Sequence, residues 1–195
     1  MSLQPRIVIP PAFACVVAAD LDRGIGRDGG LPWSRLRGDM EHFKQITSAT
    51  RSVPVQPSTA VKGPGNAINA VVMGRRTWDS IPHRYRPLRG RLNIVVSGAL
   101  RTLPSPALLA NSLTAALAIA TDAGVESIYV IGGGRLFEEA IRHPRCHFIY
   151  YTRVEGRFAA DTFFPPFEDV FVREEISKAR DESGIVYQIE LWQRP

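Results

Sequence analysis

The chain has 195 residues, of which 45% are hydrophobic and 22% charged, which is typical of a globular protein and excludes a largely disordered one. Its length favours one compact domain over residues 1–195. The two cysteines, Cys15 and Cys146, make no secreted-type disulfide framework, and no apolar run of about 18 residues predicts a membrane span, so we expect a cytoplasmic protein. The net charge of +5 favours anionic ligands, yet no basic block predicts a nucleic-acid surface.

The predicted strands are short runs rich in β-branched residues, at 13–19, 69–73, 92–97, 127–131 and 147–154, with weaker runs at 107–110, 170–177 and 185–193. Helical patterns occupy about 34–47, 75–81, 112–122 and 134–142. Helices that alternate with the early strands predict a largely parallel sheet. The last two strands are joined only by the polar link "SKARDESG", which predicts an antiparallel pair. We therefore predict an α/β fold: a three-layer sandwich with an eight-stranded mixed, mostly parallel central sheet flanked by helices.

The segment 48–68 has a different character from the rest of the chain. It contains several prolines and glycines and shows neither helical nor strand periodicity. We predict that it forms an irregular surface insertion within the single domain.

The first glycine-rich stretch, "GIGRDGGLPW", spells the dinucleotide fingerprint G-x-G-x-x-G with Gly24, Gly26 and Gly29. That fingerprint requires a helix to begin at its third glycine and aim free N–H groups at a pyrophosphate. Pro32 disfavours a helical conformation in the residue before it, so a helix can hardly begin before Trp33. The stretch is therefore predicted to be a long loop rather than a Rossmann phosphate turn.

The helix predicted over 34–47 carries an acidic residue on its apolar face. Leu36, Met40 and Phe43 recur at helical spacing, and Asp39 falls between them. Two interpretations are open. Either Asp39 is solvated near the start of the helix, or it is buried and needs a cationic or strongly donating ligand as its partner.

Two further glycine-rich turns each follow a predicted strand and precede a helix, in "VVMGRRTW" and "VIGGGRLFEEA". A helix that begins at a glycine turn presents free N–H groups to which a phosphate can bind. Either turn alone is more often a plain connection. Two of them at neighbouring strand ends favour one ligand with two anionic portions.

Six motifs now occur together, in order and at the right intervals: "GIG.DG.LPW", "D..F...T", "NAVVMGR.TW.SIP", "RPL..R.N.V.S", "IGG..LF.EA" and "DTFFP". On these residues the chain resembles the dihydrofolate reductase family, over about residues 13–193. The resemblance implies the eight-stranded fold of that family and NADPH-dependent reduction of 7,8-dihydrofolate to 5,6,7,8-tetrahydrofolate. Hydride would pass to pterin C6, and a buried Asp would assist protonation of N5.

The resemblance also implies the site residues. The catalytic set would be Asp39, which hydrogen bonds the pterin, with Leu31, Trp33 and Thr152 around it. Arg91 would hold the glutamate α-carboxylate of the substrate. The full set implied for the substrate is Val16, Val17, Ala18, Leu31, Asp39, Met40, Phe43, Ser80, Ile81, Leu88, Arg91, Ile131, Phe137 and Thr152.

The cofactor implied is NADPH, and the opening loop would close over its nicotinamide. The residues implied for it are Ala18, Ile25, Gly26, Gly29, Gly30, Leu31, Gly74, Arg75, Arg76, Thr77, Ser97, Gly98, Asn111, Ile131, Gly132, Gly133, Gly134, Arg135, Leu136, Phe137 and Thr162. The family usually has a cis bond between Gly132 and Gly133. Two positions depart from the family: Gly98 replaces a common arginine beside the 2′-phosphate, where Arg76 or Arg101 could compensate, and Phe137 replaces a common tyrosine.

Other functions fit the sequence less well. The cluster "HPRCH" lacks the spacing of a metal site, so no metal is expected. A pyrimidine reductase of riboflavin synthesis shares the fold but lacks the "LPW" and "RPL..R" segments, and a silent folate- or RNA-binding protein needs no intact acid. Beyond dihydrofolate, antifolate inhibitors are the expected ligands, with no nucleic acid or membrane. The insertion resembles one in protozoan reductases fused to thymidylate synthase, so the chain either stands alone or was excised from such a fusion.

Overall fold

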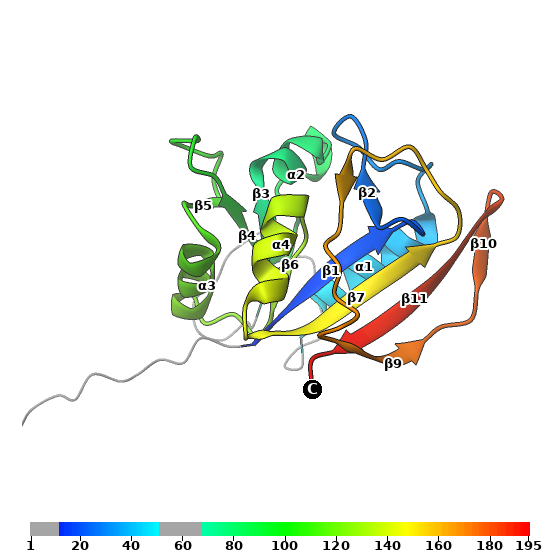
Figure 1. Cartoon of the computed structure of the whole chain (residues 1–195). Coiled ribbons are helices and arrows are strands. Elements are labelled where there is room, and N and C mark those ends of the chain that lie inside the picture. Colours follow the sequence, from blue (N-terminus) through cyan, green and yellow to red (C-terminus); the bar gives the residue numbers. More distant parts are fainter. Residues whose placement is uncertain (1–11, 51–67) are drawn as a thin grey trace, which may run out of the picture.

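The computed structural model describes residues 12–50 and 68–195. Its main sheet follows the strand order β10-β11-β7-β1-β6-β3-β4-β5, with β9 also paired to β11 (Figure 1). The strands are β1 (Phe13–Ala19), β3 (Asn69–Gly74), β4 (Arg91–Val96), β5 (Leu108–Ala110), β6 (Ile128–Val130), β7 (Cys146–Val154), β9 (Val172–Ile176), β10 (Arg180–Glu182) and β11 (Ile185–Gln193).

The sheet is mixed and mostly parallel, as predicted. Strands β1 and β3 to β7 are parallel to one another, and β11 runs antiparallel to β7. β10 pairs with the beginning of β11 and β9 with its end, so both lie along one edge of the sheet. The sheet therefore has eight strand positions, and the prediction of an antiparallel pair at the C-terminal end is confirmed.

One stretch predicted as a plain link is a strand. β10 lies within "SKARDESG" and pairs with β11 in register from Arg180↔Tyr187 to Glu182↔Ile185. The turn between them consists of Ser183 (φ 56°) and Gly184 (φ 79°). Positive φ at both central residues is the geometry of a tight hairpin turn. This turn, rather than burial of apolar side chains, brings the polar strand β10 into the sheet.

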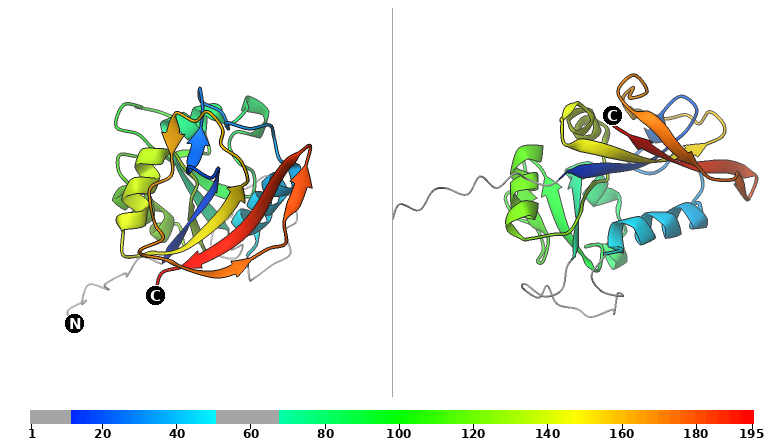
Figure 2. Two further views of the ribbon diagram at one scale, coloured as in Figure 1. Left: turned by 45° about the vertical axis from the view of Figure 1, so that its right-hand side comes forward. Right: turned by 90° about the horizontal axis from the view of Figure 1, so that it is seen from below.

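Helices cover both faces of the sheet. They are α1 (Arg37–Ser48), α2 (Arg75–Ser80), α3 (Leu113–Asp122) and α4 (Gly134–Arg142), with a short 3₁₀ turn η1 (His83–Tyr85). Figure 2 shows α1 and α4 on opposite sides of the sheet. α1 begins later than the predicted residue 34 because Leu36 is still extended (φ −92°, ψ 112°). None of these helices is long and apolar enough to cross a membrane within the ranges that the structure describes.

Two apolar layers result from the alternation of side chains along β1. Ala14 and Val16 pack with residues of α1 and α2 on one face of the sheet. Cys15 and Val17 pack with α3 and α4 on the other face. This alternation is what a strand buried on both faces requires, and it assigns each residue of β1 to one layer.

The opening glycine-rich stretch contains a short strand, β2 (Gly24–Gly26), which pairs with β8 (Thr162–Phe163). In Figure 1 this β2–β8 ribbon and α2 lie at the upper end of the sheet. The prediction that no helix begins at the third glycine of the fingerprint is confirmed. The predicted insertion, apart from its ends at 48–50 and 68, lies outside the described residues.

Candidate active site

Asp39 lies in the first turn of α1 and faces β7. Its side chain is 5% exposed and hydrogen bonds with Thr152, which is buried on β7. The structure therefore places the Asp39 carboxyl group in the interior rather than in solvent, and its need for a ligand stays a prediction. Burial raises the pKa of Asp39, the hydrogen bond with Thr152 lowers it, and the negative charge of Glu182 raises it further. The result is a carboxyl group that holds its proton to higher pH than an ordinary aspartate.

Half-buried apolar side chains lie on the α1 face of the sheet, and one of them, Phe43, follows Asp39 by about one helical turn. Phe43, Ile81, Leu88 and Ile131 pack partly against the core layer that contains Val16. They come from four different segments, so they form a wall with accessible apolar surface. Such surface beside one buried polar group is suited to a flat heterocycle with a few hydrogen-bonding edges.

Two of the residues expected at the substrate site have side chains elsewhere. Val17 belongs to the core layer on the α3–α4 face, opposite to Val16. Phe137 is 2% exposed and packs edge-on against Phe164, with ring centroids 4.9 Å apart. The alternation along β1 explains the first case, and the inward face of α4 explains the second. Of the other expected residues, Met40 and Ala18 are half-buried, and Ser80 is exposed with its hydroxyl donating to the carbonyl of Thr77.

Arg91 stands at the far end of this wall as a desolvated cation. Burial lowers its pKa to about 10. Its guanidinium lies 5.7 Å from the centroid of the Phe43 ring and donates a 2.7 Å hydrogen bond to Thr47 Oγ1. Within residues 12–50 and 68–195 no carboxylate pairs with it. A partly buried guanidinium fixed by a neutral hydroxyl is well suited to a carboxylate ligand.

Trp33 follows the opening glycine-rich loop and belongs to a third apolar cluster with Leu36 and Val154. The indole is buried and packs edge-on against Phe158, with ring centroids 5.5 Å apart. Its Nε1 is buried and makes no hydrogen bond with the described part of the chain. Leu31 lies two residues before Trp33 and is 42% exposed, so its apolar side chain is accessible to a ligand.

Two aspartates fix the opening loop, and the sequence did not single them out. Asp20 is buried and accepts hydrogen bonds from the amides of Asp22, Gly24 and Phe158 at 2.7–3.0 Å. Asp161 accepts from the amide of Asp28 at 2.8 Å. Its presence in the motif "DTFFP" was the available signal for its role. Of the loop residues expected at the cofactor, Ile25 and Gly26 are half-buried, whereas Gly29 and Gly30 are exposed.

The two glycine turns predicted to bind phosphates lie side by side. The amide of Gly74 donates to the carbonyl of Gly132 at 2.7 Å. The expected cis bond between Gly132 and Gly133 is present. A Cβ at Gly132 would lie 3.0 Å from Thr77 Oγ1, so the turns approach too closely for a side chain there. α4 begins at Gly134 with no side-chain cap, which leaves backbone N–H groups free for an anion.

The remaining expected cofactor residues lie around these turns. Arg75 and Arg76 are exposed on α2, and Arg75 approaches Asp79 at 3.5 Å. Arg135 is exposed on α4, and Leu136 is buried. Thr162 is half-buried and donates its hydroxyl to Asp161.

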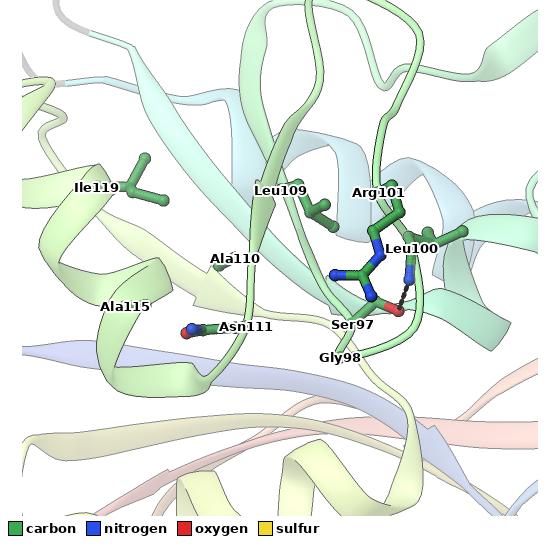
Figure 3. A pocket seen from close by; sticks show the side chains of 9 residues that line it. All are labelled: Ser97, Gly98, Leu100, Arg101, Leu109, Ala110, Asn111, Ala115 and Ile119. Atoms are coloured by element: carbon green, nitrogen blue, oxygen red, sulfur yellow. Dashed lines mark hydrogen bonds between the residues drawn. The ribbon is translucent and has the colours of Figure 1, made fainter.

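A pocket of about 380 Å³ opens beyond the end of β4 (Figure 3). It contains the expected residues Ser97, Gly98 and Asn111, whereas Arg76 does not line it. Figure 3 shows the guanidinium of Arg101 directed toward Ser97, over space that Gly98 leaves open. The rest of its lining is apolar: Leu100, Leu109, Ala110, Ala115 and Ile119. The guanidinium of Arg101, the hydroxyl of Ser97 and the apolar lining suit a ligand that carries an anionic group on a flat ring. Among the described residues no cluster of His, Cys, Asp and Glu could hold a metal ion.

Comparisons with known proteins show which family the chain resembles. The family model "Dihydrofolate reductase" matches residues 66–194. The dihydrofolate reductase of Rattus norvegicus is 35% identical over 191 residues, which cover 92% of this chain and 96% of that protein. A protein named putative dihydrofolate reductase from human herpesvirus 8 type P is 44% identical over 158 residues, covering 78% and 69%. The bifunctional dihydrofolate reductase-thymidylate synthase of Glycine max is 38% identical over 179 residues, covering 88% of this chain but only 31% of that protein.

Proposed function

This chain belongs to the dihydrofolate reductase family, a family of oxidoreductases, and we propose that it reduces 7,8-dihydrofolate to 5,6,7,8-tetrahydrofolate with NADPH as the cofactor. The observation that carries the proposal is the Asp39 carboxyl group, which is nearly out of water, hydrogen bonded to Thr152 and one helical turn from Phe43 of the half-buried apolar wall. A buried carboxyl group without a charged partner is costly unless a ligand uses it.

Asp39 binds and orients the pterin in this proposal. Its carboxylate accepts hydrogen bonds from the 2-amino group and N3 of the ring, and Thr152 holds the carboxylate from the facing strand. Because the pKa of Asp39 is raised, the group can take part in proton uptake closer to neutral pH than an exposed aspartate can. Asp39 lies on the far side of the ring from N5, so a water molecule or a tautomer of the pterin brings the proton to N5.

Arg91 binds the other end of the substrate. Its guanidinium is desolvated, held by Thr47 and without a carboxylate partner in the described ranges. The α-carboxylate of the substrate's glutamate would supply that partner through two parallel hydrogen bonds. The p-aminobenzoyl ring between the two anchors would pack on Phe43 and Leu88.

NADPH supplies the hydride when bound. The residues that would hold it fit its chemistry, because glycine turns with free N–H groups suit a pyrophosphate and the cradle at Gly132 excludes side chains. Ser97 and Arg101 would bind the 2′-phosphate at the pocket of Figure 3. Arg101 would then supply the positive charge that an arginine at position 98 provides in many members of the family. The protein contributes orientation and the exclusion of water.

The direct test is NADPH oxidation by the purified protein with and without dihydrofolate, repeated with an antifolate present. We expect oxidation that depends on dihydrofolate and stops with the antifolate. Oxidation only with a pyrimidine intermediate of riboflavin synthesis would favour that reductase instead. Binding of folate without NADPH oxidation would favour a silent binding protein.

The relation to thymidylate synthase is a separate proposal. The relatives from Glycine max and Daucus carota are named bifunctional, and this chain spans about a third of each. We propose that the chain supplies the reductase unit, either alone or within such a fusion. The mass of the native protein detected with an antibody to this chain distinguishes the two.

A further inference from the structure

The N-terminus of α1 is capped from a distant part of the chain. Glu182, at the end of β10, accepts hydrogen bonds from the amides of Arg37 at 2.6 Å and Gly38 at 2.8 Å. The residue before the helix, Leu36, provides no side-chain cap. The first N–H groups of a helix have no partner within the helix, so a carboxylate at this point satisfies them and complements the positive end of the helix dipole.

The capping carboxylate is itself held in place. Tyr187, fully buried on β11, donates its hydroxyl to Glu182 Oε1 at 2.5 Å. Hydrogen bonds from Tyr187 and from the amides of Gly38 and Arg37 lower the pKa of Glu182, which keeps this side chain ionised. The hairpin turn at Ser183 and Gly184 sets this geometry, because it pairs Glu182 with the strand that carries Tyr187.

The side chains of Glu182 and Tyr187 approach the helix so closely at Gly38 that no side chain fits there. A Cβ at Gly38 would clash with the Tyr187 hydroxyl and would lie 2.6 Å from Glu182 Oε1. Glycine inside a helix costs about 1 kcal/mol relative to alanine. The close approach of the cap gives a reason for glycine at this position, directly before Asp39.

Several charged or titratable groups surround this turn. His42 lies one turn further along α1. Burial lowers the pKa of His42, and the positive charge of Arg180 on β10 lowers it further. Arg180 also lies near Tyr187, and Arg37 lies beside Glu182. The facing residue of β7 is Thr152, which has no charge. Among these groups Glu182 is the one whose charge shifts the pKa of Asp39.

From this geometry we propose that Glu182 is a positioning residue for the reduction: it fixes the turn of α1 that carries Asp39 and places a second negative charge near that carboxyl group. The proposal rests on the proposed function of Asp39. The charge of Glu182 opposes ionisation of Asp39, so it helps to keep a proton at the pterin end of the site. The C-terminal hairpin thereby takes part in the active site without touching the substrate.

The test compares Glu182→Gln, Glu182→Ala and Tyr187→Phe with Glu41→Gln. Gln keeps a hydrogen-bond acceptor but removes the charge, and Ala removes both. Glu41 is an exposed acid on the same helix that does not shift the pKa of Asp39, so it controls for surface charge. We would titrate Asp39 by NMR in protein labelled with ¹³C-aspartate, assign its signal with Asp39→Asn, and measure the pH profile of kcat.

We expect Glu182→Gln to lower the NMR pKa of Asp39 and the pKa in the kcat profile by about half to one unit, and Glu41→Gln to leave both unchanged. Glu182→Ala and Tyr187→Phe should also speed amide hydrogen exchange at Arg37 and Gly38 and raise KM for dihydrofolate. An unchanged titration in Glu182→Gln, or an equal shift in Glu41→Gln, would overturn the proposal. Because the NMR titration needs no turnover, it decides the role of Glu182 even if dihydrofolate is not the substrate.

Discussion

At the scale of single residues, Asp39 shows a conflict between stability and function. Its carboxyl group is buried, hydrogen bonds with the neutral Thr152 and lies near the negative Glu182. Ionising it inside the fold is therefore harder than ionising it in the unfolded chain. A group of this kind reduces stability at neutral pH, and active sites commonly carry such a cost.

We expect Asp39→Asn to increase the stability of the fold at neutral pH. Because the folded pKa of Asp39 is raised, its contribution to stability is full below the unfolded pKa and is lost as pH rises through the folded pKa. Asparagine does not ionise, so the advantage of the variant should be small at pH 4 and larger at pH 7.5. Thermal denaturation at the two pH values measures this, and a variant that is less stable at pH 7.5 would contradict the burial argument.

At Arg91 we expect the planar shape of the guanidinium, and not only its positive charge, to determine the affinity for dihydrofolate. Arg91→Lys keeps the charge but loses the planar pair of donors, which should cost about 1.5 kcal/mol and raise KM for dihydrofolate about tenfold with little change in kcat. Arg89→Lys, at an exposed neighbour, is the control. Steady-state kinetics with both variants checks this. Equal KM values in wild type and Arg91→Lys would remove Arg91 from the substrate site.

Arg101 should set the preference for NADPH over NADH. Arg101→Gln would remove the cation of the pocket in Figure 3, and we expect KM for NADPH to rise about tenfold while KM for NADH hardly changes. Arg76→Gln is the matched comparison, because Arg76 is exposed on α2 and does not line this pocket. If Arg76→Gln alone changed the preference, the 2′-phosphate would bind on the α2 side.

At the scale of elements, Asp161 links two loops. It accepts a hydrogen bond from the amide of Asp28, and its own amide donates to the carbonyl of Gly26. Asp161→Ala should loosen the β2–β8 ribbon, lower kcat and raise KM for NADPH about three- to tenfold, and speed hydrogen exchange at Asp28. Asp22→Ala, which breaks only an exposed ion pair with Arg157, should have little effect. Wild-type kinetics in Asp161→Ala would show that this link does not support the loop.

The elements that the sequence predicted best are those with strong periodicity. The helix with Met40 and Phe43, which Leu36 directly precedes, and the buried parallel strands follow from apolar spacing, and the position of Asp39 follows from that helix. β10 could not be predicted in this way. It is short, polar and paired through its backbone, so no side-chain pattern marks it.

The parts of the site that the sequence missed come from the same limitation. Glu182 acts on α1 across 144 positions of the chain, and only the pairing of β10 with β11 brings it there. The hydrogen bond from Arg91 to Thr47 is likewise a contact between distant elements. Val17 and Phe137 were assigned to the substrate by resemblance, and the alternation of strand and helix faces directs their side chains into the core, so a contact of Val17 with a ligand would have to come from its backbone.

At the scale of the whole molecule, the proposed cofactor contacts gather at the carboxyl ends of the parallel strands. The two glycine turns that we propose for phosphate binding follow β3 and β6. Ser97 follows β4, and Asn111 follows β5. All four strands are parallel, so their carboxyl ends lie on the same side of the molecule. Open α/β sheets commonly bind ligands at the carboxyl ends of their strands. Arg91, the proposed substrate anchor, is the first residue of β4 and therefore lies at the opposite end of these strands. We therefore expect the cofactor at the carboxyl ends of the strands and the substrate along the α1 face, with Asp39 on the substrate side.

The central claim is that the buried carboxyl group of Asp39 supports reduction of dihydrofolate, and the most direct measurement is the pH dependence of NADPH oxidation by wild type and Asp39→Asn with saturating dihydrofolate. We expect the variant to fold, to turn over at least about 100-fold more slowly than wild type at pH 7, and to regain activity as acid solvent supplies the proton to N5. Wild-type turnover in Asp39→Asn at pH 7 would contradict the account.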